Sequence, residues 1–190
     1  NFGEYVEMNN NVDNLKKYQS KKKRGETKMD RSFEGMVKNI IKREGGSKLT
    51  RDPDDPGGTT KYGISQRAHK DVDIENLTYD QAVDIYNEHY YKPSKANSFP
   101  RELQEIYLDM VVNMGYSKAV KIVQKAANAK GAGIEEDGKL GPATLKAVKD
   151  TKLEPERLTA YRVAYYVGLC KKSPSLWKYY FGWFRRSVEV

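Results

Sequence analysis

The sequence predicts a mainly α-helical fold, because apolar residues recur at helical spacing over most of the chain and strand-like alternation is scarce. The clearest case is the run of apolar residues at 33, 36, 37, 40 and 41, the pattern of an amphipathic helix. Prolines and glycines crowd into residues 50–64, which favours turns and a small hairpin over a helix. We therefore expect a helical protein with one turn or hairpin element at about 50–64.

The helices are expected in a definite order along the chain. The first ends at Gly45-Gly46, since glycine accepts the left-handed conformation of a C-terminal cap. The second starts with the capping-box pattern Thr78-Tyr79-Asp80-Gln81 and runs to about Tyr91, where Pro93 stops it. Later helices are expected after Ser98-Phe99-Pro100, over 117–129, over 142–148 and from Pro155 onward.

The chain of 190 residues is expected to have three parts, of which the first is set off by its composition. Residues 1–30 are polar and lysine-rich without a sustained apolar period, which predicts a basic arm or linker. The alternative is a docking arm that anchors the protein in a larger assembly. We expect the remaining parts, 31–116 and 117–190, to be helical and to pack on one another, with the boundary near Gly115–Ser117.

Charge and composition exclude several classes of protein. A formal net charge of +8 attracts polyanions, namely nucleic acid, anionic cell wall or lipid headgroups, and does not choose among them. No nucleic-acid recognition motif is visible, so we expect no nucleic-acid partner. The single cysteine, Cys170, forbids an intrachain disulfide. No apolar run is long enough to predict a membrane span, and no signal-peptide pattern is visible.

Glu44 is the leading candidate for a catalytic residue. It follows Val37 and Ile40 at intervals of seven and four residues, which places its side chain on the apolar face of the first helix. Burial and the negative end of the helix dipole both favour the protonated carboxyl. A protonated carboxyl is what a general acid in glycoside cleavage requires. The competing interpretation is a solvated glutamate at a frayed helix end.

An acidic, glycine-rich turn follows Glu44 and supports the catalytic interpretation. Asp52, Asp54 and Asp55 lie within four residues, and Gly57-Gly58 lets the backbone approach a ligand closely. The Thr59 and Thr60 hydroxyls are both candidates to hold a water. A second carboxylate with a positioned water suits an inverting glycosidase, whereas a closer carboxylate suits a retaining one. The alternative is a calcium site, but the spacing does not fit an EF-hand.

Two further polar pairs are open to more than one interpretation. Asp109 and Asn113 lie four residues apart on a predicted helix, so they either face the cleft or hydrogen bond to each other. His69 and His89 show no partner pattern, and we expect them at the surface or as helix caps instead of in catalysis.

Several of these motifs, in order, resemble the glycoside hydrolase family 108 muramidases of phages and bacteria. The matching residues are Glu44-Gly45-Gly46, Asp52 to Thr60, and Tyr62-Gly63-Ile64, followed by Ala82, Ile85-Tyr86 and Tyr90, and by Asp109, Asn113 and Gly115. Ser47 departs from the family, which usually has tyrosine there, and this puts an aromatic wall of the cleft in doubt. Later residues resemble the peptidoglycan-binding region that often follows, namely Ala119 to Ala126, Asp137-Gly138, Gly141-Pro142, Thr144-Leu145 and Gly182-Trp183 with Arg186.

The resemblance implies a lysozyme-like helical fold that hydrolyses the β-1,4 bond between N-acetylmuramic acid and N-acetylglucosamine in peptidoglycan. It assigns the general acid to Glu44, and by position we expect Asp55 as the second catalytic group, with Thr60 holding the water. Substrate contacts are expected at Asp54, the alternate second group, and at Gly58, Tyr62, Asp109 and Asn113. Neither a metal nor an organic cofactor is implied.

The expected role is therefore degradation of the bacterial cell wall, by a phage-encoded enzyme that acts in the periplasm or at the exterior. Virion or phage tail proteins are expected as further partners through residues 1–30. The alternative function is a non-catalytic wall-binding or structural tail component that keeps the same fold.

Overall fold

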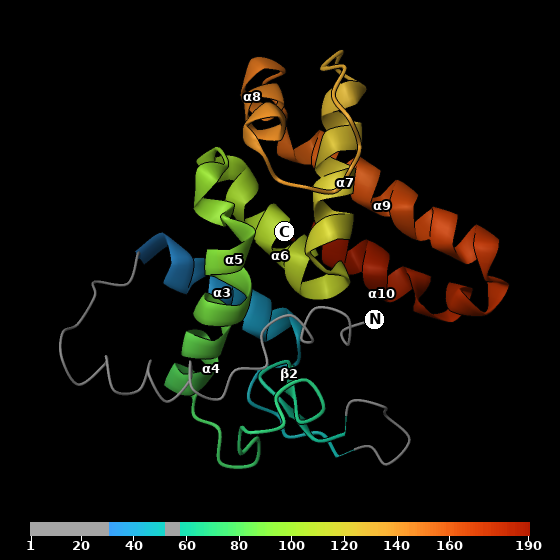
Figure 1. Ribbon diagram of the computed structural model, residues 1–190. Helices are drawn as coiled ribbons and strands as arrows, with labels where there is room; N and C mark the ends of the chain where they lie inside the picture. The colour runs from blue at the N-terminus through green and yellow to red at the C-terminus, as the bar shows by residue number, and fades with distance from the viewer. Residues whose placement is uncertain (1–30, 52–57) are drawn as a thin grey trace. The chain divides into compact units, whose positions relative to one another are not determined.

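A computed structural model describes residues 31–51 and 58–190 (Figure 1). The predicted basic arm, 1–30, and most of the acidic turn, 52–57, lie outside the described residues. The chain forms two compact units, of which the first ends at His89 and the second comprises Tyr90–Val190. Helices supply most of the regular structure of the described residues, which confirms the mainly α, lysozyme-like fold expected from the sequence.

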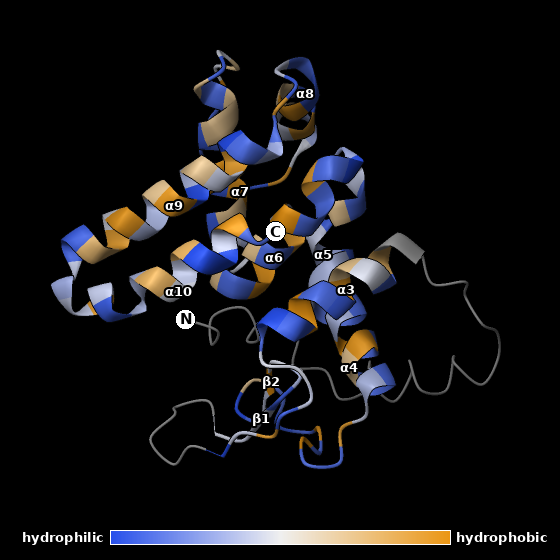
Figure 2. Ribbon diagram, turned by 180° about the vertical axis from the view of Figure 1, so that it is seen from behind, coloured by the Kyte–Doolittle hydropathy of each residue, from blue (hydrophilic) through white to orange (hydrophobic). Residues whose placement is uncertain are grey.

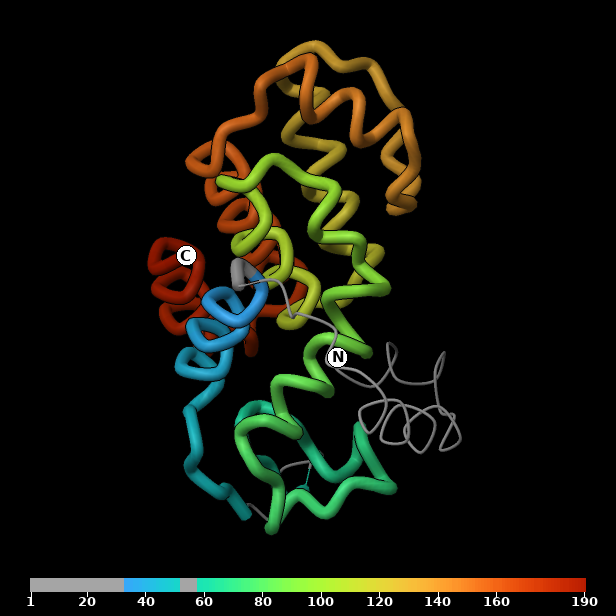
Figure 3. Tube along the Cα trace, turned by 90° about the vertical axis from the view of Figure 1, so that its left-hand side faces the viewer, coloured from blue at the N-terminus to red at the C-terminus, as the bar shows by residue number. Residues whose placement is uncertain are grey.

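The helices of the first unit are α3, Arg31–Arg43, and α4, Tyr79–Tyr86, which continues as the π-helical segment η1, Asn87–Tyr91. α3 packs on α4, and Figure 3 shows the path of the chain through these two helices. The predicted apolar face of α3 is buried, and apolar residues of the following loop and of α4 complete the core. These core residues are Phe33, Met36, Val37, Ile40, Ile41, Ile64, Ile74, Leu77, Ala82, Val83, Ile85 and Tyr86.

The N-terminus of α4 confirms the predicted capping box. The Thr78 hydroxyl accepts a hydrogen bond from the backbone N–H of Gln81, and the Gln81 side chain accepts one from the backbone N–H of Thr78. The expectation that Pro93 stops this helix is wrong, because the helical backbone runs through η1 into α5, Lys92–Ser94. Pro93 is the second residue of α5 and directly follows the π-helical segment.

The predicted hairpin is present between α3 and α4. Strand β1, Thr60–Lys61, pairs antiparallel with β2, Ile64–Ser65, with Lys61 opposite Ile64. The two loop residues, Tyr62 and Gly63, have φ values of 54° and 77°. Positive φ at both positions is what a type I′ turn requires, and this turn matches the twist of a short hairpin. An isolated bridge from Thr50 to Thr60 extends the pairing by one position.

The second unit is built from helices joined by short connections, except for the longer loop 129–141 between α7 and α8. Its elements after α5 are η2, Ala96–Ser98; α6, Arg101–Met114; α7, Tyr116–Asn128; α8, Pro142–Asp150; α9, Pro155–Lys172; η3, Pro174–Leu176; and α10, Trp177–Val188. α6, α7 and α9 pack against one another, and α10 folds back onto α9 through η3 (Figures 1 and 3). Buried apolar residues on α6, α7 and α9 form the core of this unit.

The loop between α7 and α8 is held by one buried side chain. Gln124 donates hydrogen bonds to Asp137 and Thr144 at 2.8 and 3.1 Å and accepts one from the backbone N–H of Gly138 at 2.9 Å. A Cβ at Gly138 would lie 2.5 Å from the Ser117 hydroxyl oxygen, so the close approach of the loop to α7 requires glycine. The Asp-Gly motif noted in the sequence therefore fixes a loop.

The packing of the chain places α6 and α7 in the same compact unit, since the division into units lies after His89. The boundary near Gly115–Ser117 that the sequence suggests stays a prediction about the organisation of the domains. Among residues 31–51 and 58–190, every helix is too short or too polar to cross a membrane.

Candidate active site

Glu44 lies at the point where α3 ends. Its backbone N–H donates to the Ile40 carbonyl at 3.0 Å, so the residue completes the last helical turn. The backbone N–H of Gly46 then reaches back to the Ile41 carbonyl at 2.9 Å, with Gly45 and Gly46 in the left-handed region. This glycine-capped end confirms the predicted helix terminus. The Glu44 side chain is half-buried, with its Oε1 atom enclosed.

The tip of the hairpin packs directly against Glu44. The backbone N–H of Tyr62 donates to the Gly46 carbonyl at 3.1 Å and so joins the hairpin to the end of α3. A Cβ at Gly63 would lie 2.6 Å from the Cβ and 2.8 Å from the Cγ of Glu44. Real Cβ atoms do not approach so closely, so only glycine allows this contact with the Glu44 stem. The hairpin therefore restricts the position of the Glu44 side chain at the end of α3.

Tyr86 on α4 holds the same turn from the other side. Its hydroxyl donates to the Tyr62 carbonyl at 3.0 Å, and the ring is buried. A Cβ at Gly63 would also lie 2.6 Å from the Tyr86 hydroxyl oxygen. Gly63 and Tyr86 are therefore positioning residues for Glu44. Both belong to motifs that carry the family resemblance, but the sequence alone assigned neither of them a role. The Tyr-Gly pair between two short strands was the available signal for the turn.

The remaining predicted site residues of the first unit surround this turn. Tyr62 is partly exposed and meets Tyr79 edge to face, with ring centroids 6.0 Å apart. The Thr60 hydroxyl donates to the Gly58 carbonyl at 3.4 Å, a weak bond, and both residues are partly exposed. Asp54 and Asp55 lie outside the described residues. The predictions for these five residues are therefore not tested by the contacts that the structure describes.

Asp109 and Asn113 lie in the second unit, and each contacts another helix. The Asp109 carboxylate has no exposed surface and accepts hydrogen bonds from Arg162 at 2.7 Å and from Arg186 at 3.0 Å. Burial alone would raise the pKa of Asp109, but the two guanidinium groups outweigh it and hold that pKa below the usual range. Asn113 accepts a hydrogen bond from the Tyr166 hydroxyl. These contacts join α6 to α9 and α10, and the predicted substrate contacts stay predictions.

His69 does not occupy the surface or capping position expected for it, whereas His89 is partly exposed. His69 is buried, and its ring meets that of His89 edge to face at a centroid distance of 5.1 Å. Burial, with a smaller effect of His89, lowers the pKa of His69 from 6.5 to about 4. Burial also lowers the pKa of His89, against the opposing effect of Glu88. The expectation for His69 was wrong because a neutral imidazole packs like an aromatic ring.

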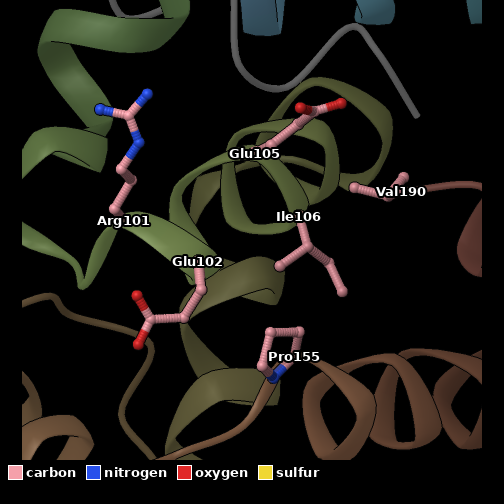
Figure 4. Close-up of a pocket in the computed structure, with 6 residues that line it drawn as sticks. All are labelled: Arg101, Glu102, Glu105, Ile106, Pro155 and Val190. Atoms are coloured by element: carbon pink, nitrogen blue, oxygen red, sulfur yellow. The ribbon is translucent and has the colours of Figure 1, made fainter. Parts of the chain in front are cut away.

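No group of three or more His, Cys, Asp or Glu side chains is placed to hold a metal ion within the described residues. A shallow pocket of about 460 Å³ lies in the second unit and contains none of the predicted site residues. It is lined by Arg101, Glu102, Glu105, Ile106, Pro155 and Val190. In Figure 4 the charged ends of Arg101, Glu102 and Glu105 point outward around Ile106. This arrangement brings no reactive group to the floor of the pocket.

Comparison with known proteins assigns both parts of the chain. Residues 37–115 match the glycosyl hydrolase 108 family model, and residues 118–188 match the model described as a predicted peptidoglycan domain. The solved structure of Brucella abortus SagA is similar, with a TM-score of 0.66 and 26% sequence identity over 83% of this chain and 90% of that chain. A search of curated proteins found no match. Glu44, Gly63 and Tyr86 all fall inside the first matched region. The two matches together show that the chain combines a glycosyl hydrolase 108 region with a predicted peptidoglycan domain and is a glycoside hydrolase that acts on peptidoglycan.

Proposed function

We propose that this protein is a muramidase, which hydrolyses the β-1,4 bond between N-acetylmuramic acid and N-acetylglucosamine with Glu44 as the general acid. One observation carries the proposal: within the glycosyl hydrolase 108 region, the Glu44 carboxyl is held at the end of α3 by the hairpin turn at Gly63. A general acid must keep a fixed direction toward the leaving oxygen, and a carboxyl packed on its stem meets that need.

The chemistry follows the general scheme for glycosidases. Glu44 donates its proton to the glycosidic oxygen as the bond to the anomeric carbon breaks. Asp55 serves as the second carboxylate, with Thr60 orienting the attacking water, and Asp54 is the alternative at that position. Tyr62 and Gly58 lie on the same hairpin and its approach, where sugar contacts are proposed.

Glu44→Gln tests the assignment of the acid. The amide keeps the shape of the side chain but has no acidic proton, so turnover of purified peptidoglycan should be lost while peptidoglycan binding is kept. Glu34→Gln is the matched control, because Glu34 is exposed on the same helix. Mass spectrometry of the products should show reducing-end N-acetylmuramic acid. Anhydro-muramyl products, reducing-end N-acetylglucosamine or turnover by Glu44→Gln would each contradict the proposal.

The second catalytic group is tested separately. Asp55→Asn should reduce turnover sharply, and Asp54→Asn should reduce it less. The reverse order would assign the second group to Asp54. A wild-type protein that binds peptidoglycan but does not hydrolyse it, with variants that behave the same way, would identify the non-catalytic wall-binding or structural component.

The biological setting is also part of the proposal. The peptidoglycan-directed regions support action at the bacterial cell wall. We infer a phage-encoded lytic enzyme in which residues 1–30 dock to virion or tail proteins. Deletion of residues 1–30 should then leave peptidoglycan turnover intact and weaken that docking, whereas loss of turnover would make the arm part of the catalytic region.

A further inference from the structure

The last helix presents an apolar face that the packing of the second unit does not use. Trp177, Phe181, Phe184 and Val188 follow one another at intervals of four, three and four residues along α10, so they share one face. Their exposed fractions are 48%, 73%, 40% and 54%. We call these residues the aromatic stripe. Figure 2 shows apolar and polar residues in alternation along the same helix.

A different face of α10 makes the contacts that hold the helix in the second unit. Trp183 stacks on Tyr166 of α9 with ring centroids 4.9 Å apart, and Ser187 is buried. Arg186 contributes to the buried ion pair with Asp109. The aromatic stripe is therefore additional to the apolar surface that the unit needs for folding. Exposed aromatic residues in one row are costly in water and typically mark an interaction surface.

Basic side chains flank the aromatic stripe. Residues 171–188 contain five basic residues and no acidic ones. The next residue, Glu189, is exposed and forms an ion pair with Arg185 at 3.6 Å, so the segment 171–189 keeps an excess of four positive charges. Lys178 and Arg185 are seven residues apart and so lie together along one edge of the stripe. Lys171 and Lys172 are exposed at the end of α9, from which η3 leads into α10. The chain as a whole carries a net charge of +8.

This combination fits an anionic lipid surface better than the other two partners that an aromatic face can bind. The flanking Lys178 and Arg185 can donate hydrogen bonds to a sugar chain, but their positive charges favour an anionic partner over neutral sugar rings. A second copy of the chain would bring the same basic edges together, which is unfavourable. In amphipathic helices at lipid surfaces, aromatic residues enter the headgroup region while flanking Lys and Arg contact lipid phosphates.

We propose that α10 is a membrane-surface docking element, with the aromatic stripe inserted among the headgroups of an anionic bilayer and Lys178 and Arg185 on the lipid phosphates. The helix lies in the plane of the surface, since the stripe runs along its length. This contact is independent of the chemistry at Glu44. An enzyme docked in this way would be concentrated where bilayer and cell wall adjoin.

Flotation of the full chain with vesicles tests the proposal. The protein should float with vesicles of phosphatidylcholine mixed with phosphatidylglycerol and much less with phosphatidylcholine alone. Phe181→Gln should weaken this binding about tenfold, because the most exposed ring of the stripe is lost. Lys178→Gln with Arg185→Gln should remove the preference for the anionic vesicles.

Tyr179→Gln is the matched control in the same helix. Tyr179 is 50% exposed but lies off the aromatic stripe, so this variant should float as the wild type does. Circular dichroism melting confirms that each variant is folded. The proposal is overturned if neither vesicle binds, or if Phe181→Gln and Tyr179→Gln behave alike. It is likewise overturned if Phe181→Gln abolishes only dimerisation or only peptidoglycan binding.

Discussion

Gly63 lies against the stem of Glu44 so closely that a methyl group at position 63 would stand 2.6 Å from the Glu44 Cβ. The candidate acid is thus positioned by the absence of a side chain on a neighbouring turn. Helix α3 supplies the carboxyl, the hairpin sets its direction, and Tyr86 of α4 fixes the hairpin.

Gly63→Ala should damage both stability and activity. The left-handed φ of 77° is unfavourable for alanine, and the new methyl group meets Glu44 and the Tyr86 hydroxyl. Together these effects should cost about 2–4 kcal/mol of unfolding free energy. Displacement of the carboxyl by a fraction of an ångström or more should lower peptidoglycan turnover up to about a hundredfold. Denaturant unfolding and a turbidity assay measure the two effects.

Gly133→Ala separates backbone strain from the clash. Gly133 has a φ of 66°, but a Cβ there meets nothing within 4 Å. This control should cost only about 1–2 kcal/mol and leave turnover of the folded protein unchanged. Equal loss of turnover in both variants would show that the Gly63 contact does not position Glu44.

Tyr86→Phe tests the hydrogen bond that fixes the turn. The variant keeps the buried ring but loses the bond from the hydroxyl to the Tyr62 carbonyl, which should cost about 1 kcal/mol. Turnover should fall more than this stability change explains, because the freed turn no longer holds Glu44 in one position. Turnover is to be measured well below the melting temperature, where both proteins are folded.

Tyr107→Phe provides the comparison in the second unit. Its buried hydroxyl donates to the Ser94 carbonyl at 3.1 Å, so the same kind of bond is lost. The cost in stability should be similar, about 1 kcal/mol, and turnover should be unaffected. If the two variants lose turnover equally, Tyr86 acts through general stability alone.

Asp109→Asn should destabilise the second unit strongly. It leaves Arg162 buried, and Arg186 partly buried, without their carboxylate, and removal of one partner of a buried pair costs about 3–5 kcal/mol. Asp150→Asn removes a carboxylate from the exposed pair with Lys146 and should cost at most about 1 kcal/mol. Thermal unfolding measures both. Near-wild-type stability of Asp109→Asn together with weakened peptidoglycan binding would favour the predicted substrate contact.

The sequence predicted the helices and the end of α3 well, because these depend on local signals. Apolar spacing located the buried face of α3, and Gly45-Gly46 located its end. The partners of Asp109 could not be predicted, because Arg162 and Arg186 are 53 and 77 residues away along the chain. The same holds for Tyr86, which reaches the hairpin across 24 residues. Spacing identifies the helix face on which a residue lies, but only the fold shows what that residue meets.

Acid should destabilise the first unit through His69. Its pKa is about 4 in the folded protein and 6.5 without burial, so between these values the unfolded chain binds a proton that the folded one does not. Stability therefore falls as the pH falls through this window. The loss should reach about 3 kcal/mol, since one pKa unit corresponds to about 1.4 kcal/mol. Urea unfolding at a series of pH values measures it.

His69→Phe should remove most of this dependence while keeping an aromatic ring against His89. The Nε2 atom of His69 is buried and has no hydrogen-bond partner among the described residues, so phenylalanine removes a polar atom that they leave unsatisfied. His89→Phe should remove a smaller share, because His89 is more exposed. Asp109 does not affect the measurement in this pH window. The pKa of its carboxyl lies below 3.8, so its contribution to the free energy of unfolding is lost only in stronger acid. An unchanged pH profile in His69→Phe would mean that His69 is already protonated, and so accessible to water, in the folded protein.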